Sequence, residues 1–290
     1  MKELEFRWER KKPEDFIVKE ISEFPICESG NHYLYLLVKR NMTTLEVCRK
    51  FNLSYAGMKD KFALTFQKVS STEFLGFTIG KPQGESWFLL RFIGKVRKKI
   101  RIGNLKGNLF AVNLNNLPVD LRNWFINYYD VQRVKGENWR RGKEILFGKK
   151  RKLNRRENFL VDSYLSYLWN RSFERFLKNR FPGYYVTEKG CRFFIPSTSL
   201  EEVKKLPKFW TILGYKKKLL ESEEPYREIL KEEDINLENL IERLRELKIK
   251  GDYRMTYVEV RKLKLFKNRL IFELPKGSFA TMFLKHIQRA

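Results

Sequence analysis

One acid between two lysines, Lys59-Asp60-Lys61, is the arrangement in this chain that best fits a catalytic site. Residues 53–56 before it and 64–70 after it are typical of short strands. Gly57 allows a turn between them, so Asp60 is predicted on a loop between two strands, where catalytic side chains often lie on a rigid frame. An ionised carboxylate there could act as a nucleophile or as a base. The alternative is a solvated charged turn, because short charged motifs often occur by chance.

The elements that must position this loop can be predicted from composition and hydrophobic pattern. Residues 15–21 and 32–38 are rich in apolar and β-branched side chains and predict strands. Thr43 and Glu46 match a capping box, which predicts a short helix leading back to the loop. Residues 86–102 predict a further strand that ends in a basic edge.

The chain changes character after Trp139, where a dense basic run is followed by helical patterns. Apolar residues at helical spacing predict a long amphipathic helix at 157–180. A second helix is predicted before Gly251, which closes it. Residues 255–261 and 263–274 then alternate as strands, which are expected to return to the sheet of the first part.

The charge balance favours a polyanionic partner. Sixty Lys and Arg residues face 35 Asp and Glu residues, which gives a formal net charge of +25. Adaptation to heat would add both signs, so it does not explain an excess of one. A nucleic acid is the expected partner. The cations expected to contact its phosphates are Lys59, Lys61, Lys95, Arg97, Lys98, Lys99, Arg101, Arg140, Arg141, Lys149, Lys150 and Arg151.

Other features of the sequence argue against several classes of protein. The cysteines Cys27, Cys48 and Cys191 are far apart and lie away from both histidines, which predicts free thiols, a reducing compartment and no metal site. No apolar run has the length of a membrane span and the N-terminus has no signal-peptide core, so a cytoplasmic protein is expected. No glycine-rich phosphate loop is present, so no nucleotide cofactor is expected.

The segment around Asp60 also fits a longer pattern, Ala-Gly-x-Lys-Asp-x-x-Ala-x-Thr-x-Gln. Its seven fixed positions are filled without a gap by Ala56, Gly57, Lys59, Asp60, Ala63, Thr65 and Gln67. This block resembles the signature of the TruD family of pseudouridine synthases. The resemblance places the family's catalytic aspartate at Asp60.

Further segments resemble motifs of the same family. Residues 16–20 resemble its opening motif Phe-x-Val-x-Glu, 103–110 its motif Gly-x-x-Lys-Gly-Asn-x-Phe, and 274–281 its closing motif. Residues 127–133 are similar to a fourth motif but carry Asp130 in place of glycine. The resemblance therefore spans nearly the whole chain.

The resemblance implies an α/β (α+β) fold, in which a catalytic domain with a mixed, largely antiparallel sheet is interrupted by a mostly helical insertion domain. The change of character after Trp139 and the returning strands agree with this arrangement. We therefore expect residues 1–126 and 252–290 to form a discontinuous catalytic domain, and residues 127–251 to form the insertion domain.

The resemblance also implies a chemistry and a site. Pseudouridine formation breaks the bond between C1′ and N1 of uridine and rejoins the base through C5, so it requires no cofactor. Asp60 would act ionised, and an ionised acid in a dry pocket needs a cation, for which Lys19 is expected as the ion-pair partner. Asn108, Phe110 and Phe279 are expected to line the uridine pocket, with Phe110 as the stacking residue. For Phe110, a place in the core is the alternative.

The implied substrate is tRNA, at the uridine of position 13, and the protein is expected to act as a monomer. Two other functions remain open from the sequence. A non-catalytic RNA-binding protein of the same fold would carry the same charge but would not need Asp60. Another RNA-modifying enzyme, such as a methyltransferase, would need a glycine-rich loop for its methyl donor, which the sequence does not contain.

Overall fold

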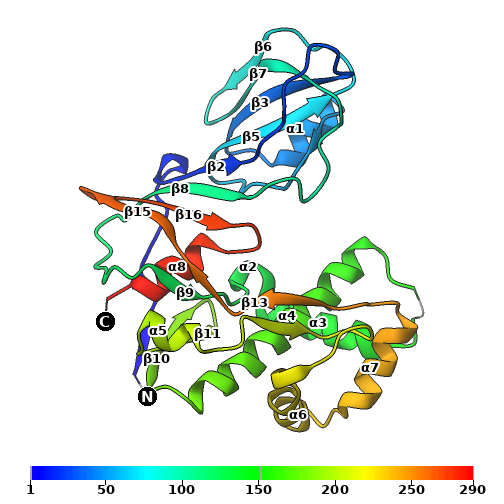
Figure 1. Cartoon of the computed structure of the whole chain (residues 1–290), viewed down its shortest axis with the longest axis vertical. Coiled ribbons are helices and arrows are strands. Elements are labelled where there is room, and N and C mark those ends of the chain that lie inside the picture. The colour runs from blue at the N-terminus through cyan, green and yellow to red at the C-terminus, as the bar shows by residue number, and fades with distance from the viewer. Residues whose placement is uncertain (1, 151, 290) are drawn as a thin grey trace. The chain divides into compact units, whose positions relative to one another are not determined.

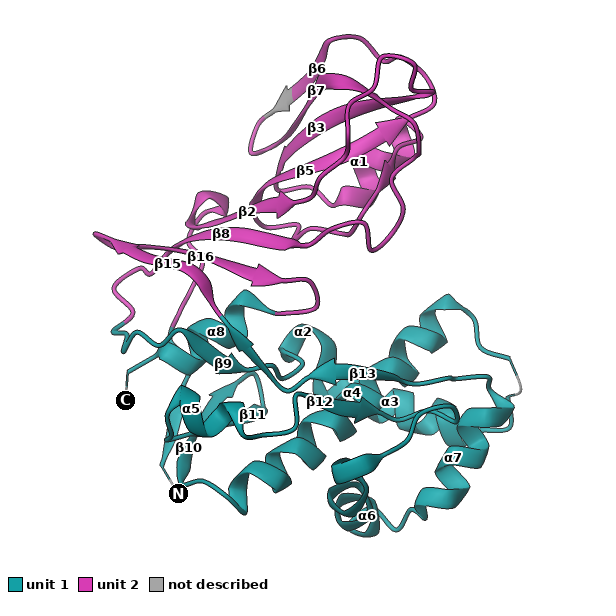
Figure 2. Ribbon diagram, viewed as in Figure 1, with its two compact units in different colours: residues 1–7, 118–259, 279–290 teal, residues 8–117, 260–278 magenta. Residues whose placement is uncertain are grey.

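The computed structural model of the chain describes residues 2–150 and 152–289. Its contacts divide the chain into two units, which are coloured separately in Figure 2. Unit 2, which holds Asp60, consists of Trp8–Leu117 and Val260–Ser278. Unit 1 consists of Met1–Arg7, Pro118–Glu259 and Phe279–Ala290.

These units do not follow the predicted boundaries at 126/127 and 251/252. Strand β9 (Trp124–Ile126) pairs with β14 (Tyr257–Glu259), and helix α8 (Ala280–Ile287) packs on β9. At the other end of the chain, β1 (Glu3–Glu5) adds in parallel to β10 (Gly183–Glu188). Both terminal segments therefore group with unit 1, because their hydrogen bonds and packing partners are there.

Unit 2 is built on a nine-stranded mixed sheet (Figure 1). Only β2 and β5 pair in parallel among the pairs of this sheet within the described residues, which confirms the expected mixed, largely antiparallel architecture. In spatial order the strands are β15 (Arg261–Phe266), β16 (Arg269–Pro275), β8 (Gly107–Asn113), β2 (Phe16–Ile21), β5 (Leu64–Ser71), β3 (His32–Arg40), β7 (Ser86–Val96) and β6 (Thr78–Gln83), with β4 (Ser54–Tyr55) beside β5.

Local sequence signals explain several of these elements. The predicted capping box is present: the Thr43 side chain accepts from the Glu46 backbone N–H, and helix α1 (Thr44–Lys50) follows. The predicted strand at 86–102 ends earlier, at Val96. The basic residues beyond Val96 lie on a loop, which is held to the sheet by the bond from the Ile100 N–H to Ser70 Oγ, 2.9 Å.

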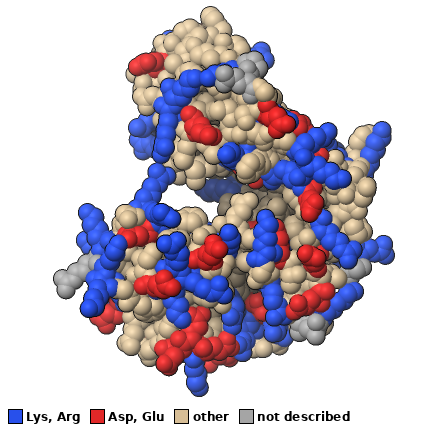
Figure 3. Space-filling view, turned by 180° about the vertical axis from the view of Figure 1, so that it is seen from behind, with Lys and Arg blue, Asp and Glu red and all other residues tan. Residues whose placement is uncertain are grey.

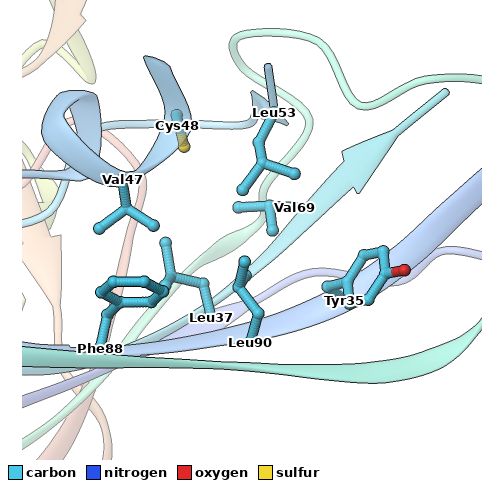
Figure 4. Packing of buried hydrophobic residues seen from close by; sticks show 8 residues of the cluster. All are labelled: Tyr35, Leu37, Val47, Cys48, Leu53, Val69, Phe88 and Leu90. Atoms are coloured by element: carbon cyan, nitrogen blue, oxygen red, sulfur yellow. The ribbon is translucent and has the colours of Figure 1, made fainter. Parts of the chain in front are cut away.

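Helix α1 packs against one face of the sheet through a cluster of buried apolar side chains (Figure 4). Tyr35 and Leu37 point to the same face because side chains alternate along a strand. Each fully buried side chain of this kind contributes about 1.5–3 kcal/mol. The cluster consists of Tyr35, Leu37, Val47, Cys48, Leu53, Val69, Phe88 and Leu90. Burial raises the pKa of the Cys48 thiol to about 12, so this cysteine is an inert core residue.

The glycine in the segment Gly107-Asn108-Leu109-Phe110 is explained by close packing. A Cβ at Gly107 would lie 2.2 Å from the backbone carbonyl oxygen of Leu274 on β16. Only glycine therefore lets β8 and β16 approach at this point. This approach sets the register that pairs Asn108 with Leu274 and Phe110 with Phe272.

Unit 1 is organised around the long helix α4 (Arg155–Lys178), which begins with a capping box formed by Asn154 and Glu157. This helix confirms the amphipathic helix predicted at 157–180. The unit also contains several short strands. Its further elements are α2 (Val131–Val134), α3 (Gly136–Phe147), β11 (Cys191–Pro196), α5 (Leu200–Lys204), β12 (Phe209–Ile212), α6 (Glu223–Lys231), α7 (Leu237–Glu246) and β13 (Asp252–Met255). Among the helices of the described residues, none has both the length and the hydropathy that a membrane crossing requires.

A buried histidine in unit 1 leads to a prediction about stability. The His286 ring lies against Trp124, with ring centroids 4.6 Å apart, and neither ring nitrogen has a hydrogen-bond partner among the described residues. Burial, and to a lesser extent Arg122, lowers the pKa of His286 from 6.5 to about 3. Between these two values the unfolded chain binds a proton that the folded chain does not, so stability falls as the pH drops from 6.5 towards 3.

We expect His286→Phe to raise the free energy of unfolding at pH 7 by about 1–2 kcal/mol, because it removes two unpaired polar atoms from the interior. The gain should be larger at pH 5, since the variant no longer carries the acid-sensitive group. Urea unfolding of both proteins at pH 7 and pH 5 measures this. Equal gains at the two pH values would contradict the assigned cause.

Candidate active site

Asp60 lies on the loop between β4 and β5, as predicted. Its side chain is 21% exposed, so the carboxylate is accessible although the loop is packed against the sheet. The loop is anchored to β3 by the fully buried Lys39, whose Nζ donates to the backbone carbonyl of Asp60 at 2.7 Å. Burial lowers the pKa of Lys39 to about 8, and the nearby Asp60 carboxylate opposes that shift. Lys39 thus positions the loop through the backbone.

The carboxylate of Asp60 forms a bidentate ion pair with the guanidinium of Arg10. Nη1 of Arg10 donates to Oδ1 at 3.0 Å, and Nη2 donates to Oδ2 at 3.1 Å. The backbone N–H of Phe62 also donates to Oδ1, at 2.8 Å. Arg10 is itself fixed by aromatic rings, with its guanidinium carbon 4.5 Å from the centre of the Phe16 ring. Charge-assisted pairs of this geometry fix orientation as well as charge.

The expected ion pair between Asp60 and Lys19 is wrong, because Arg10 takes that place. Phe16, Val18 and Glu20 alternate with Lys19 along β2, and these three are the buried side chains. Lys19 points to the opposite face and is exposed.

The expectation that Lys59 contacts phosphate is also wrong. Nζ of Lys59 lies 2.6 Å from Oε2 of Glu20, and the two side chains are 4% and 0% exposed. Ser22 Oγ donates to the other oxygen of Glu20 at 2.9 Å. A buried ion pair has no free charge to offer to RNA, so Lys59 ties the loop to β2. Lys61, in contrast, is exposed.

Other residues of the signature block hold the loop in place. Thr44 accepts from the Lys59 backbone N–H at 3.0 Å and donates to the Gln67 side chain at 2.9 Å. Gln67 in turn donates to the Gly57 carbonyl at 3.2 Å. The φ angle of Gly57 is not in the left-handed region, and a Cβ there would meet only ordinary contacts. The loop is therefore shaped by these hydrogen bonds and not by glycine's freedom.

Strand register gathers the remaining candidate residues on the face of the sheet that carries Glu20. Lys39, Thr65, Val18 and Phe110 are successive cross-strand partners on β3, β5, β2 and β8, so their side chains share one face. Phe110 is buried between Phe16 and Phe272, with ring centroids 5.7 and 5.3 Å away.

Asn108 lies on the same face and is paired in register with Glu20. Its Oδ1 is buried and has no hydrogen-bond partner among the described residues. Such an orphaned acceptor is costly in a folded protein unless a ligand satisfies it. Asn108 is therefore suited to receive an N–H group from a ligand.

Phe279 belongs to unit 1, where its ring centroid lies 6.5 Å from that of Tyr129. The guanidinium of Arg254 lies 5.7 Å from the Phe279 ring. A place for Phe279 in the uridine pocket stays a prediction.

The other cations expected to contact RNA lie in two regions. Arg97, Lys98, Lys99 and Arg101 are exposed on the loop after β7, whereas Lys95 is half-buried beside Tyr33. Arg140 and Arg141 are exposed on α3, and Lys149 and Lys150 follow it. Lys150 is paired with Glu157. The prediction for Arg151 lies outside the described residues. Figure 3 shows Lys and Arg side chains spread over one face of the molecule, with Asp and Glu among them.

Three residues of this site were missed by the sequence analysis. Arg10 lies in a polar segment without a pattern, and only the fold brings it to Asp60. Lys39 could have been noticed, because it continues an almost wholly apolar strand. Glu20 could also have been noticed, because it follows Phe16 and Val18 at the spacing of one strand face.

The family model described as tRNA pseudouridine synthase D (TruD) matches residues 9–149 and 150–287 of the chain. A tRNA pseudouridine synthase D of Wolinella succinogenes is 31% identical over 230 residues, which cover 69% of this chain and 63% of that protein. One of Nitratiruptor sp. is 32% identical over 187 residues, which cover 56% of this chain and 51% of that protein. The chain thus spans about half to two thirds of the length of these curated relatives.

A crystal structure from Methanosarcina mazei that carries the name tRNA pseudouridine synthase D (TruD) superposes with a TM-score of 0.62 at 21% identity. The superposition covers 98% of this chain and 93% of that one, which shows a shared fold and agrees with the expected α/β class. Because the family model covers both units almost from end to end, the chain belongs to the TruD family of tRNA pseudouridine synthases.

Proposed function

We propose that this protein is a tRNA pseudouridine synthase, an isomerase that converts a uridine of tRNA into pseudouridine. By family resemblance, the uridine is the one at position 13. In this reaction the C1′–N1 bond breaks and a C1′–C5 bond forms. N1 gains a proton and C5 loses one, so the product has the same composition as the substrate. The reaction needs no cofactor, and we propose that none is used.

The observation that carries the proposal is the way Asp60 is bonded. A carboxylate has about four lone-pair directions. Among the described residues, Oδ1 accepts from both Arg10 and Phe62, whereas Oδ2 accepts only from Arg10. Oδ2 therefore keeps one lone pair on a partly exposed group, aligned by a rigid guanidinium. It is the oxygen that would attack C1′ or remove a proton from C2′.

Asn108 supports the proposal from the side of the base. Uracil carries an imide N3–H between two carbonyl groups, and its recognition requires a hydrogen-bond acceptor. The buried Oδ1 of Asn108 lacks a donor among the described residues, and Asn108 shares the sheet face of Lys39, which holds the Asp60 loop. A hydrogen bond from N3–H would satisfy this oxygen and would hold the detached base while it turns.

We also propose that the enzyme works as a monomer in the cytoplasm, where tRNA is found. Asp60, Arg10 and Asn108 all come from one unit of one chain, so the reaction does not require a second copy. The exposed cations supply the phosphate contacts that dominate RNA affinity.

The test is incubation of the protein with tRNA that carries tritium at C5 of uridine. A pseudouridine synthase releases this tritium to water, because C5 loses its hydrogen when the base is rejoined. A non-catalytic RNA-binding protein binds the tRNA without release. A methyltransferase that acts elsewhere on the tRNA leaves the label in place and requires a methyl donor. No release from any tRNA would refute the proposed function.

The role of Phe110 in catalysis has to be tested with a smaller change in side-chain volume than Phe110→Ala. Because its ring is buried between Phe16 and Phe272, Phe110→Ala should destabilise unit 2 by about 3–5 kcal/mol and would confuse folding with function. Phe110→Leu should cost only about 1–2 kcal/mol. If the ring stacks on the uracil, this variant should lose turnover about tenfold with nearly unchanged tRNA affinity. Tritium release and urea unfolding measure the two effects, and full turnover would assign Phe110 to the core alone.

A further inference from the structure

Unit 1 contains a large pocket that the chemistry at Asp60 does not use. It lies between α3, α4 and the hairpin of β10 and β11, and its volume is about 810 Å³. Small-molecule sites in proteins commonly measure about 300–1,000 Å³. Its base includes the buried side chains of Tyr185 and Phe193.

Two stacked aromatic rings line this pocket. Trp139 on α3 and Tyr167 on α4 are parallel within 2°, with ring centroids 4.1 Å apart. Both residues are only half-buried. They form a rigid aromatic platform, because Arg171 Nη1 donates to the Tyr167 hydroxyl at 2.9 Å and the guanidinium of Arg140 lies 5.0 Å from the Trp139 ring. Because the two rings cover each other's inner faces, a flat heterocycle would extend the stack on an outer ring face.

The charges around the pocket are mainly positive. Its lining includes two acids, Glu137 and Glu174, and seven cations. The cations are Lys135, Arg140, Arg171, Arg175, Lys178, Lys189 and Arg192. Glu174 is occupied, because it accepts from the Tyr185 hydroxyl at 2.5 Å. Within the described residues, Arg140, Lys178 and Lys189 form no ion pair. All three are exposed, and Lys178 and Lys189 are available for phosphate, whereas Arg140 lies against the Trp139 ring.

We propose that this pocket binds one unstacked nucleotide of a single-stranded stretch of RNA, at a second site besides the uridine pocket. The base stacks on the platform of Trp139 and Tyr167, and the flanking phosphates contact Lys178 and Lys189. A free nucleotide has the same chemistry. Unpaired cations around one stacking platform, however, suit an RNA backbone that passes through the pocket with a phosphate on each side of the bound base. The inference rests on the proposed function for RNA as the ligand.

The position of Lys189 allows a clean test. It lies at the tip of the β10–β11 hairpin with φ of +47°, followed by Gly190 with φ of +78°. Asparagine tolerates this backbone conformation better than lysine does. Lys189→Asn therefore removes a cation from the pocket without harming the turn. A loss of RNA binding in this variant cannot be attributed to a weaker fold.

The experiment measures binding of a short single-stranded RNA oligonucleotide to the full chain by fluorescence anisotropy, over a range of salt concentrations. Trp139→Leu, which keeps an apolar side chain but removes the flat ring, should weaken binding about tenfold. Lys189→Asn should reduce the slope of log affinity against log salt by about 0.7, the value for one phosphate contact on a single strand. Thermal melting confirms that each variant is folded.

Two matched controls share the chemistry of these changes but lie outside the pocket. Phe147 is an exposed aromatic residue on the same helix as Trp139, and Lys231 is an exposed lysine on α6. Phe147→Leu and Lys231→Gln should change affinity less than twofold. Equal losses in variants and controls would overturn the proposal. So would full competition by uridine monophosphate at the affinity of the oligonucleotide, which would assign the pocket to a free nucleotide.

The second RNA site and the proposed function can be confirmed or refuted independently. Tritium release depends on Asp60, whereas oligonucleotide affinity depends on Trp139 and Lys189. A protein that releases tritium but binds RNA equally well in all variants would keep the enzyme assignment and lose the second site. A protein without tritium release whose RNA affinity depends on Trp139 would keep the second site alone.

Discussion

Asp60→Asn is expected to reduce tritium release from C5-labelled tRNA by at least about a thousandfold. An amide can neither attack C1′ nor accept a proton from C2′, so both mechanisms that remain open for this acid predict the loss. The variant keeps the size of the side chain. The amide oxygen Oδ1 of the variant can still accept from the Phe62 N–H. The amide nitrogen Nδ2 takes the place of the acceptor Oδ2, so two donors face each other at Arg10. We therefore expect some loss of stability alongside the loss of turnover.

A matched control separates these two effects. Glu14 forms a similar pair with Arg40 in the same unit, with Oε1 of Glu14 2.6 Å from Nε of Arg40. Glu14→Gln breaks an arginine–carboxylate pair without touching Asp60, so it should lose stability but keep turnover within about twofold. Tritium release and urea unfolding of both variants, with tRNA affinity, complete the comparison. If Asp60→Asn retained a tenth of the wild-type rate, Asp60 would not be the catalytic acid.

Arg10→Gln is expected to lower the turnover rate about a hundredfold while leaving tRNA affinity nearly unchanged. Arg10 supplies two of the three hydrogen bonds that fix the Asp60 carboxylate. Without them the carboxylate can rotate about its bond to Cβ, and small displacements of a reacting group cost rates of this size. Steady-state kinetics should therefore show the loss in kcat and little change in KM.

The controls are a second substitution of Arg10 and a substitution of Lys19. Arg10→Lys keeps the charge but loses the planar fork, so its rate should lie between those of the wild type and Arg10→Gln. Lys19→Gln should behave almost like the wild type, because Lys19 is exposed on the opposite face of β2. A larger loss from Lys19→Gln than from Arg10→Gln would show that Lys19 is the partner of Asp60 during turnover.

Much of the architecture around Asp60 could be predicted from local patterns. The capping box of Thr43 and Glu46 and the strands that flank the loop depend on neighbouring residues, and all are present. The signature block from Ala56 to Gln67 also singled out Asp60. Its side chains now have physical roles, since Gln67 and Lys59 anchor the loop.

The partners of Asp60 could not be predicted in the same way. Lys19 was expected as the ion-pair partner by family resemblance, and Lys59 was expected to contact phosphate, but the side a strand residue faces depends on which face of the sheet is covered. The sheet places Glu20 within reach of Lys59 and turns Lys19 away. The contact units differ from the predicted domain boundaries for a related reason, because β1 and β9 pair with strands far along the chain.

The sequence by itself therefore determined the family, the candidate acid and the local elements, because these depend on residue types at short spacing. Only the tertiary structure decided that Arg10 holds the acid, that Lys39 supports its loop and that Asn108 carries a buried, unpaired oxygen. Each of these contacts joins residues more than twenty positions apart or depends on what covers a side chain. Such contacts are set by strand register and packing, which no short pattern records.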